Sequence, residues 1–226
     1  MPLYQKIGVI GAGAWGTALS MALHRAGRDV MLWAREKRVV DTINQQHENS
    51  LYLPNAMLSD EIIATDKMQD MLGCDVLCIV CPSQYARVIF KLLRQAGLPS
   101  TTPLILCCKG VEQGSLQLMT DVMLQELPQN PCAVLSGPSF AIEVAQGLPA
   151  SLTLACKKIL IGRKLKRSIE SENFKIFQSQ DIVGAEIGGA VKNVIAIACG
   201  IAEGSGLGQN AKAALITGGL EEMWRI

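Results

Sequence analysis

A glycine-rich turn near the start of the chain constrains the fold more than any other feature. The apolar run 6–10 leads into the sequence GAGAWG at residues 11–16, and the small residues after it favour a helix. A glycine at position 11 permits a tight turn, one at 13 lets a phosphate approach the backbone, and one at 16 allows the helix to pack closely on the strand. The N-terminus of a helix also attracts phosphates through its free N–H groups and its dipole. The pattern predicts a dinucleotide bound at Gly11, Gly13, Ala14, Trp15 and Gly16. The alternative is a turn that binds nothing.

The end of the second predicted strand indicates which dinucleotide binds. Residues 29–34 form a strand that ends near Arg35, and Glu36, Lys37 and Arg38 follow. An arginine at this position suits the 2′-phosphate of NADP, whereas an acidic residue suits the ribose hydroxyls of NAD. The cationic surplus favours NADP, and Glu36 keeps NAD open. A solvated first turn of the next helix is the other interpretation of these charges.

Strand-like and helix-like segments alternate along most of the chain. We expect further strands at residues 62–65, 75–80, 103–108, 132–135, 149–156 and 174–178, and helices at 39–46, 85–96 and 116–127. This βαβ order predicts an α/β fold with a doubly wound Rossmann-type sheet, whose ligands gather at the carboxyl ends of the strands. Three strand ends carry polar residues, namely 81–83 (CPS), 109–110 (KG) and 136–139 (SGPS). Ser139 can also cap the helix that follows it.

The character of the sequence changes near residue 185. Residues 186–199 are apolar on nearly all sides, which predicts a buried helix. Lys192 and Asn193 interrupt it, and a lysine in such a helix must pair, bind a ligand or become less basic through desolvation. A lysine near a helix end can instead extend to solvent, but the adjacent Asn193 favours a site. We therefore divide the chain into a dinucleotide-binding domain, residues 1–184, and the beginning of a helical domain, residues 185–226.

Composition and charge exclude several classes of function. The net charge is +1, so no strong field attracts nucleic acid, and the lysine-rich stretch 157–167 lacks aromatics and predicts a solvated helix face. No apolar run reaches the ~18 residues of a membrane span, and we expect no secretory signal. Most of the eight cysteines lie in apolar runs, as reduced thiols of a cytoplasmic protein do. Cys78 and Cys81 have metal-site spacing, but they lie along a strand without further ligands, so no metal is predicted.

Six stretches of the sequence carry a resemblance to a known family. They are GVIGAGAWGTALS (8–20), LWAR (32–35), CPS (81–83), CCKGVE (107–112), LSGPSFAIEVAQGLPAS (135–151) and residues 182–223. These stretches resemble the NAD(P)-dependent glycerol-3-phosphate dehydrogenases of bacterial type. The resemblance implies an NADPH site and a glycerol 3-phosphate site that share one lysine. It implies that the NADPH site includes Trp15, Arg35, Lys109 and Ala141, and that Lys109, Gly137, Ser139, Lys192 and Asn193 bind substrate, with Lys192 as the proton acceptor.

The resemblance implies an oxidoreductase that interconverts sn-glycerol 3-phosphate and dihydroxyacetone phosphate and supplies the former for phospholipid synthesis. The hydride leaves C2 while the C2 hydroxyl loses a proton, and a lysine can take that proton if burial and a neighbouring cation, here Lys109, lower its pKa. A cytoplasmic enzyme with a small-molecule substrate is expected, and a homodimer stays open. Two other functions also stay open, namely a reductase of another small hydroxy compound and an inactive NADP-binding fragment.

The sequence departs from the family pattern at two places. Gly218 stands where the family usually has an arginine. Family members also continue beyond the position of Ile226 as a helical domain, which supplies an aspartate near the reacting carbon and a Ser-Arg-Asn cluster for the substrate phosphate. We therefore expect a truncated version of the family's site in these 226 residues.

Overall fold

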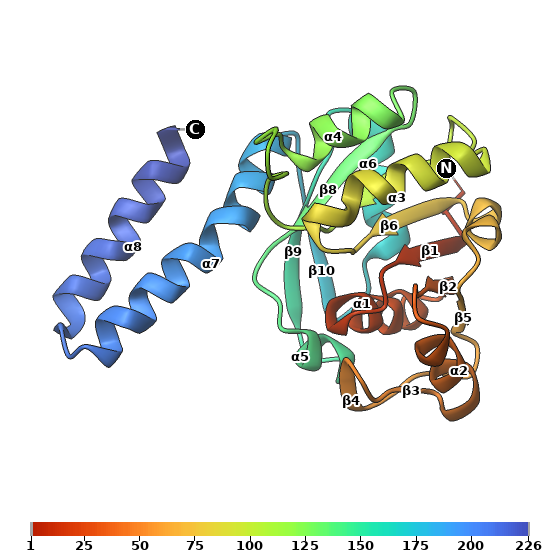
Figure 1. Cartoon of the computed structure of the whole chain (residues 1–226), viewed down its shortest axis with the longest axis horizontal. Helices are drawn as coiled ribbons and strands as arrows, with labels where there is room; N and C mark the ends of the chain where they lie inside the picture. The colour runs from red at the N-terminus through yellow and green to blue at the C-terminus, as the bar shows by residue number, and fades with distance from the viewer. Residues whose placement is uncertain (1, 226) are drawn as a thin grey trace.

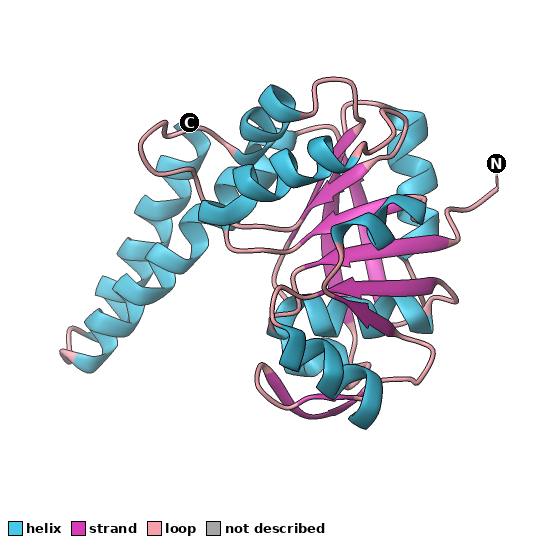
Figure 2. Ribbon diagram, turned by 45° about the vertical axis from the view of Figure 1, so that its right-hand side comes forward, coloured by secondary structure: helices cyan, strands magenta, loops and turns pink. Residues whose placement is uncertain are grey.

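The computed structural model describes residues 2–225 and contains one large mixed sheet with helices on both faces (Figures 1 and 2). The strand order is β10-β9-β8-β7-β6-β1-β2-β5. The strands are β1 (Lys6–Ile10), β2 (Asp29–Trp33), β5 (Ile63–Thr65), β6 (Val76–Ile79), β7 (Leu104–Leu106), β8 (Cys132–Ser136), β9 (Ala150–Ala155) and β10 (Phe174–Ser179). The Rossmann-type α/β fold predicted from the sequence is confirmed.

Helices cover both faces of the sheet because each buries an apolar stripe against it. One core lies under α1 (Ala14–Arg25), α2 (Lys37–Gln46), α5 (Ala141–Ala145) and α6 (Ile159–Ile169). The other lies under α3 (Ser83–Ala96), α4 (Met119–Glu126) and the 3₁₀ segment η1 (Met68–Gly73). Every residue of β6 and β7 is buried, as the apolar runs of central parallel strands predict.

Two parts of the sheet region differ from the expectation. Strand β9 runs antiparallel to β8, although β9 and β10 are parallel. The only helix described between β8 and β9 is the five-residue α5, which spans about 8 Å, against the ~17 Å of a five-residue strand. No full crossover helix returns the chain to the start of β8, and β9 pairs with β8 in the antiparallel direction. The segment near residue 50, for which the sequence analysis expects neither a strand nor a helix, forms a small hairpin of β3 (Glu48–Asn49) and β4 (Leu53–Met57).

The last two helices project from the sheet as a pair, as Figures 1 and 2 show. They are α7 (Ile182–Gly204) and α8 (Gly208–Arg225). The burial expected for the apolar helix is incomplete in the structure, because Val194, Ile197 and Ile201 are each more than 60% exposed. The start of α7 packs on the sheet, and its later part contacts α8 alone among the elements described. By length and composition alone α7 would suffice to cross a membrane, with a mean hydropathy of 1.6 over its most apolar window.

Candidate active site

The three glycines of the N-terminal turn have separate roles. Gly11 has φ +119°, and a Cβ there would lie 2.9 Å from the backbone nitrogen of Cys81. A Cβ on Gly16 would overlap the carbonyl oxygen of Gly11, so this glycine lets α1 pack on the turn. Gly13 differs, because no atom of the described chain lies within 4 Å of its Cβ position. It precedes α1 and makes no side-chain cap, so the first N–H groups of α1 face this open space. The arrangement fits a pyrophosphate.

A buried asparagine that the sequence analysis missed supports this turn. Asn49 is 1% exposed, and its amide donates to the carbonyl oxygen of Ala12 and to the hydroxyl of Thr17, both at 2.8 Å. It lies in the unpredicted β3–β4 hairpin, and no local pattern marks it. The hairpin therefore holds the phosphate-facing turn in place from outside the βαβ unit.

The end of β2 presents both of the predicted charges. The Arg35 side chain is 72% exposed, and its guanidinium carbon lies 5.9 Å from the ring centroid of Tyr85 on α3. The Glu36 carboxylate accepts a hydrogen bond of 3.1 Å from Tyr52. It also lies 3.8 Å from the guanidinium groups of both Arg35 and Arg38. Glu36 is therefore already engaged by three groups of the chain, and the two tyrosines are contacts that the sequence analysis missed.

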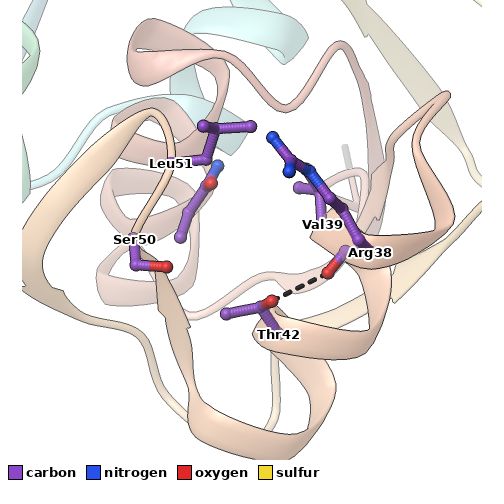
Figure 3. Close-up of a pocket in the computed structure, with 6 residues that line it drawn as sticks. Arg38, Val39, Thr42, Ser50 and Leu51 are labelled. Carbon is purple, nitrogen blue, oxygen red and sulfur yellow. Dashed lines mark hydrogen bonds between the residues drawn. The ribbon is translucent and has the colours of Figure 1, made fainter.

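A pocket of about 290 Å³ adjoins this strand end. In Figure 3, Arg38 and Thr42 of α2 face Ser50 and Leu51 of the β3–β4 turn across it. The Thr42 hydroxyl donates to the carbonyl oxygen of Arg38 at 2.7 Å, and the Arg38 side chain extends over the opening.

The three polar strand ends meet as predicted, and the start of α7 joins them. A Cβ on Gly110, after β7, would lie 3.0 Å from the hydroxyl of Ser83, after β6. On α7, a Cβ on Gly189 would lie 3.0 Å from the hydroxyl of Ser136 and 3.7 Å from Cγ of Lys109. These close approaches bring four elements together at the carboxyl edge of the sheet.

Two lysines lie side by side at this edge. Lys192 of α7 donates to the carbonyl oxygen of Gly137 at 3.3 Å. Burial, and next the neighbouring ammonium of Lys192, lower the pKa of Lys109 to about 8. The sequence analysis expected a lysine made less basic by desolvation and by a second cation, and in the structure that lysine is Lys109. Near pH 8 the pair therefore contains a neutral amine, which can accept a proton.

Ser139 does not cap the helix after it. Helix α5 begins after Phe140, which has an extended backbone and no side-chain cap. The Ser139 hydroxyl is buried and has no hydrogen-bond partner among residues 2–225. A buried hydroxyl is rarely left unpaired in a folded protein, so a substrate oxygen is a fitting partner. The cap prediction is wrong because α5 starts one residue later than the Pro138-Ser139 pattern indicates.

The other residues that the sequence analysis singled out lie less favourably for direct contact with a cofactor or substrate. Ala141 is the first residue of α5, which packs along α1. Asn193 follows Lys192 but is exposed on α7. A Cβ on Gly218 would meet no described atom within 4 Å, so the arginine usual in the family would have room there. Cys78 and Cys81 are buried free thiols.

An ion pair fixes the loop that carries Lys109. Arg87 of α3 donates to both carboxylate oxygens of Glu112 at 2.7 and 2.8 Å, and Gln84 donates to the carbonyl oxygen of Val111 at 2.8 Å. The guanidinium of Arg87 lowers the pKa of Glu112 to about 2. The loop between β7 and α4 is therefore tied to α3.

Comparison with known proteins agrees with this geometry. The family models for the N-terminus and the C-terminus of NAD-dependent glycerol-3-phosphate dehydrogenase match residues 6–160 and 181–226. A glycerol-3-phosphate dehydrogenase [NAD(P)+] of Paramagnetospirillum magneticum is 52% identical over 98% of this chain and 80% of its own length, and one of Maricaulis maris is 49% identical over 100% and 68%. The crystal structure of glycerol-3-phosphate dehydrogenase from Coxiella burnetii superposes with a TM-score of 0.92 at 38% identity, covering 99% of this chain and 69% of that one. The chain belongs to the NAD-dependent glycerol-3-phosphate dehydrogenase family.

Proposed function

We propose that this protein is an NAD(P)-dependent oxidoreductase that interconverts sn-glycerol 3-phosphate and dihydroxyacetone phosphate, and so supplies glycerol 3-phosphate for phospholipid synthesis. The observation that carries the proposal is the pair of Lys109 and Lys192 at the carboxyl edge of a Rossmann sheet whose first strand leads into an open phosphate-facing turn. Family membership narrows the substrate from small hydroxy compounds in general to this one.

The lysine pair exchanges a proton with the C2 hydroxyl of the substrate and attracts the negative charge of the substrate's phosphate. When bound, the nicotinamide ring takes up or gives the hydride at C2 of the substrate. Lys192 is the proton acceptor for the C2 hydroxyl in the oxidative direction and returns the proton in the reductive one. Burial and the neighbouring ammonium of Lys192 lower the pKa of Lys109 to about 8, so at that pH the two side chains together carry fewer than two protons and can exchange one with the substrate. The remaining ammonium attracts the phosphate dianion.

Further contacts orient the substrate. The Ser139 hydroxyl, which is buried without a partner in the described chain, donates to a substrate oxygen. Gly137 brings its carbonyl to Lys192 and, with φ +151°, packs against the backbone of Leu152 where a side chain would not fit. Asn193 completes the proposed substrate set next to Lys192.

The cofactor preference is for NADP over NAD. Arg35 is exposed at the end of β2 beside Tyr85, where it can meet a 2′-phosphate, and Arg38 adds a second cation. Glu36, the alternative ligand for the ribose of NAD, is already paired with Tyr52 and lies near both arginines. Trp15, Lys109 and Ala141 complete the proposed cofactor site.

We also propose the wider setting of the enzyme. Residues 1–184 form the dinucleotide-binding domain and residues 185–226 begin a helical domain, which the projection of α7 and α8 supports. The eight free cysteines suit the reducing cytoplasm. The exposed apolar residues of α7 and α8 favour a homodimer, and sedimentation of the purified protein tests it, since a monomer at all concentrations would contradict it.

The function is tested by offering the purified protein NADPH with dihydroxyacetone phosphate or with phosphate-free dihydroxyacetone. The proposal expects NADPH oxidation that depends on the phosphorylated ketone and is much slower with the unphosphorylated one. NADPH binding without turnover, or equal rates with both ketones, would contradict it.

A further inference from the structure

We propose that Glu186 is a positioning residue for the lysine pair. Its carboxylate fastens the start of α7 to the first turn of α4 and so fixes Lys192 relative to Lys109. The effect of Glu186 on catalysis rests on the proposed function, whereas its effect on the positions of Lys109 and Lys192 does not.

The contact is a two-pronged hydrogen bond between helices far apart in the sequence. One carboxylate oxygen of Glu186 accepts from the backbone nitrogen of Thr120 at 2.9 Å, and the other accepts from the Thr120 hydroxyl at 2.5 Å. Both residues are only 7% exposed. The bond therefore lies inside the protein, away from competing water.

The carboxylate serves α4 as a cap supplied by another helix. The residue before α4 is Leu118, whose side chain cannot accept a hydrogen bond, so the first N–H groups of α4 lack a local acceptor. Glu186 supplies one, and the positive end of the helix dipole favours its charge there. Burial raises the pKa of Glu186, while the two hydrogen bonds from Thr120 oppose that rise. A buried carboxylate held in this way loses its partners if α7 shifts, which makes the position of α7 well defined.

This hydrogen bond joins the two chain segments that carry the lysines. From Lys109 the chain runs through the loop tied by Arg87 and enters α4 at Met119, next to Thr120. From Glu186, α7 runs past Gly189, which packs on Ser136 and Lys109, to Lys192. Lys192 thus lies six residues from the hydrogen-bonded junction and Lys109 eleven residues from it, on the two chain segments that the junction joins. Loss of the junction lets α7 move, and Gly189 offers no side chain to hold it.

The experiment measures the pKa of Lys109 directly, by its rate of acetylation against pH with mass-spectrometric detection. In the unchanged protein this pKa should be about 8. In Glu186→Ala it should rise towards the ordinary 10.5, because Lys192 moves away and water reaches Lys109. The direct electrostatic effect of removing a carboxylate is opposite in sign and would lower the pKa. A rise therefore reports a change of position.

Three further variants sharpen the test. Glu186→Gln can still accept from the Thr120 N–H through its amide oxygen and can donate from its amide nitrogen to the Thr120 hydroxyl oxygen. It keeps the junction without the charge, so its Lys109 pKa should stay near or slightly below that of the unchanged protein. Thr120→Val removes only the hydroxyl and should give a smaller rise, and it carries the test if Glu186→Ala fails to fold. Asn130→Ala is the matched control: Asn130 is 6% exposed and donates to the carbonyl oxygens of Pro99 and Thr102 before β7 and β8, so it should lower stability and leave Lys109 unaltered.

Turnover provides the second readout. A displacement of about 1 Å in a reacting group can cost on the order of 100-fold in rate, so kcat should fall on the order of 10- to 100-fold in Glu186→Ala, while the KM for NADPH changes little. An unchanged or lowered pKa of Lys109 in folded Glu186→Ala or Thr120→Val would overturn the positioning role. If the pKa rises but the unchanged protein does not reduce dihydroxyacetone phosphate, the positioning stands and the proposed function fails.

Discussion

Alanine substitutions at Gly13 and Gly16 should separate cofactor binding from folding. The two residues lie three positions apart in one turn, and each change adds a single methyl group. Gly13 has φ −74°, which alanine adopts freely, and no atom of residues 2–225 lies within 4 Å of the added carbon. The added carbon of Gly16→Ala would overlap the Gly11 carbonyl oxygen, which belongs to the backbone and cannot rotate away.

The expected magnitudes follow from these contacts. Gly13→Ala costs about 0.5–1.5 kcal/mol as a poorer helix cap, largely offset by about 0.4–1 kcal/mol from a less flexible unfolded chain, so the melting temperature without ligand should change by only a few degrees. Gly16→Ala forces α1 away from the turn at about 1–3 kcal/mol, or roughly 2–12 °C for a chain of this length. For NADPH, the methyl group at position 13 displaces the pyrophosphate from the N–H groups of α1. Loss of one charge-assisted hydrogen bond of about 1.5–3 kcal/mol weakens binding roughly 10- to 100-fold.

Thermal unfolding without ligand and calorimetric titration with NADPH measure the two effects separately. Gly13→Ala should nearly keep its melting temperature and lose affinity, whereas Gly16→Ala should lose both. Normal NADPH affinity in Gly13→Ala would refute the placement of the phosphates over this residue. An unchanged melting temperature in Gly16→Ala would refute the close packing of α1.

Three other outcomes are expected. Arg35→Ala should weaken NADPH binding more than NADH binding, since only NADPH carries the 2′-phosphate, and equal losses in parallel titrations would count against this role. Arg87 lowers the pKa of Glu112 in the folded protein to about 2, so this pair stabilises the fold above pH ~4.5, and that stabilisation disappears as the pH falls towards 2. The urea midpoint of Glu112→Gln should therefore vary less with pH than that of the unchanged protein between pH ~4.5 and 2. Identical pH profiles for the two proteins would contradict this. In the monomer, at concentrations below any dimer seen by sedimentation, hydrogen exchange should be faster in the later part of α7 and in α8 than in β1 and β6, because α8 has no buried residue among those described; equal protection at those concentrations would contradict this.

The strand ends and their polar residues could be predicted because local pattern decides them. Alternating apolar runs and glycine turns specify a parallel sheet, and parallel strands bring their carboxyl ends to one edge, so Ser83, Lys109 and Ser136 were expected near each other. The antiparallel β9 was not expected, since the length of α5 decides it and short helices leave little trace in the sequence.

The supporting contacts could not be predicted, because they join residues far apart in the chain. Asn49 with Ala12, Tyr52 with Glu36, and Glu186 with Thr120 each depend on how whole elements pack. Apolar composition predicted that α7 is a helix, but it does not specify what covers each side of a helix, so the expected burial is incomplete in the structure.

The most direct test of the proposed function measures two quantities in Lys192→Ala and Lys192→Arg, the rate of dihydroxyacetone phosphate reduction and the affinity for NADPH. Lys192 contacts Gly137 at the substrate edge, and the proposed role of Lys192 is toward the C2 hydroxyl and not the pyrophosphate, so NADPH binding should survive both changes. Reduction of dihydroxyacetone phosphate should fall by about 10²–10⁴-fold or more in Lys192→Ala. Lys192→Arg should not restore it, because a guanidinium does not give up its proton in a protein. Near-normal turnover in either variant would contradict the assignment of Lys192 as the group that exchanges the substrate's proton.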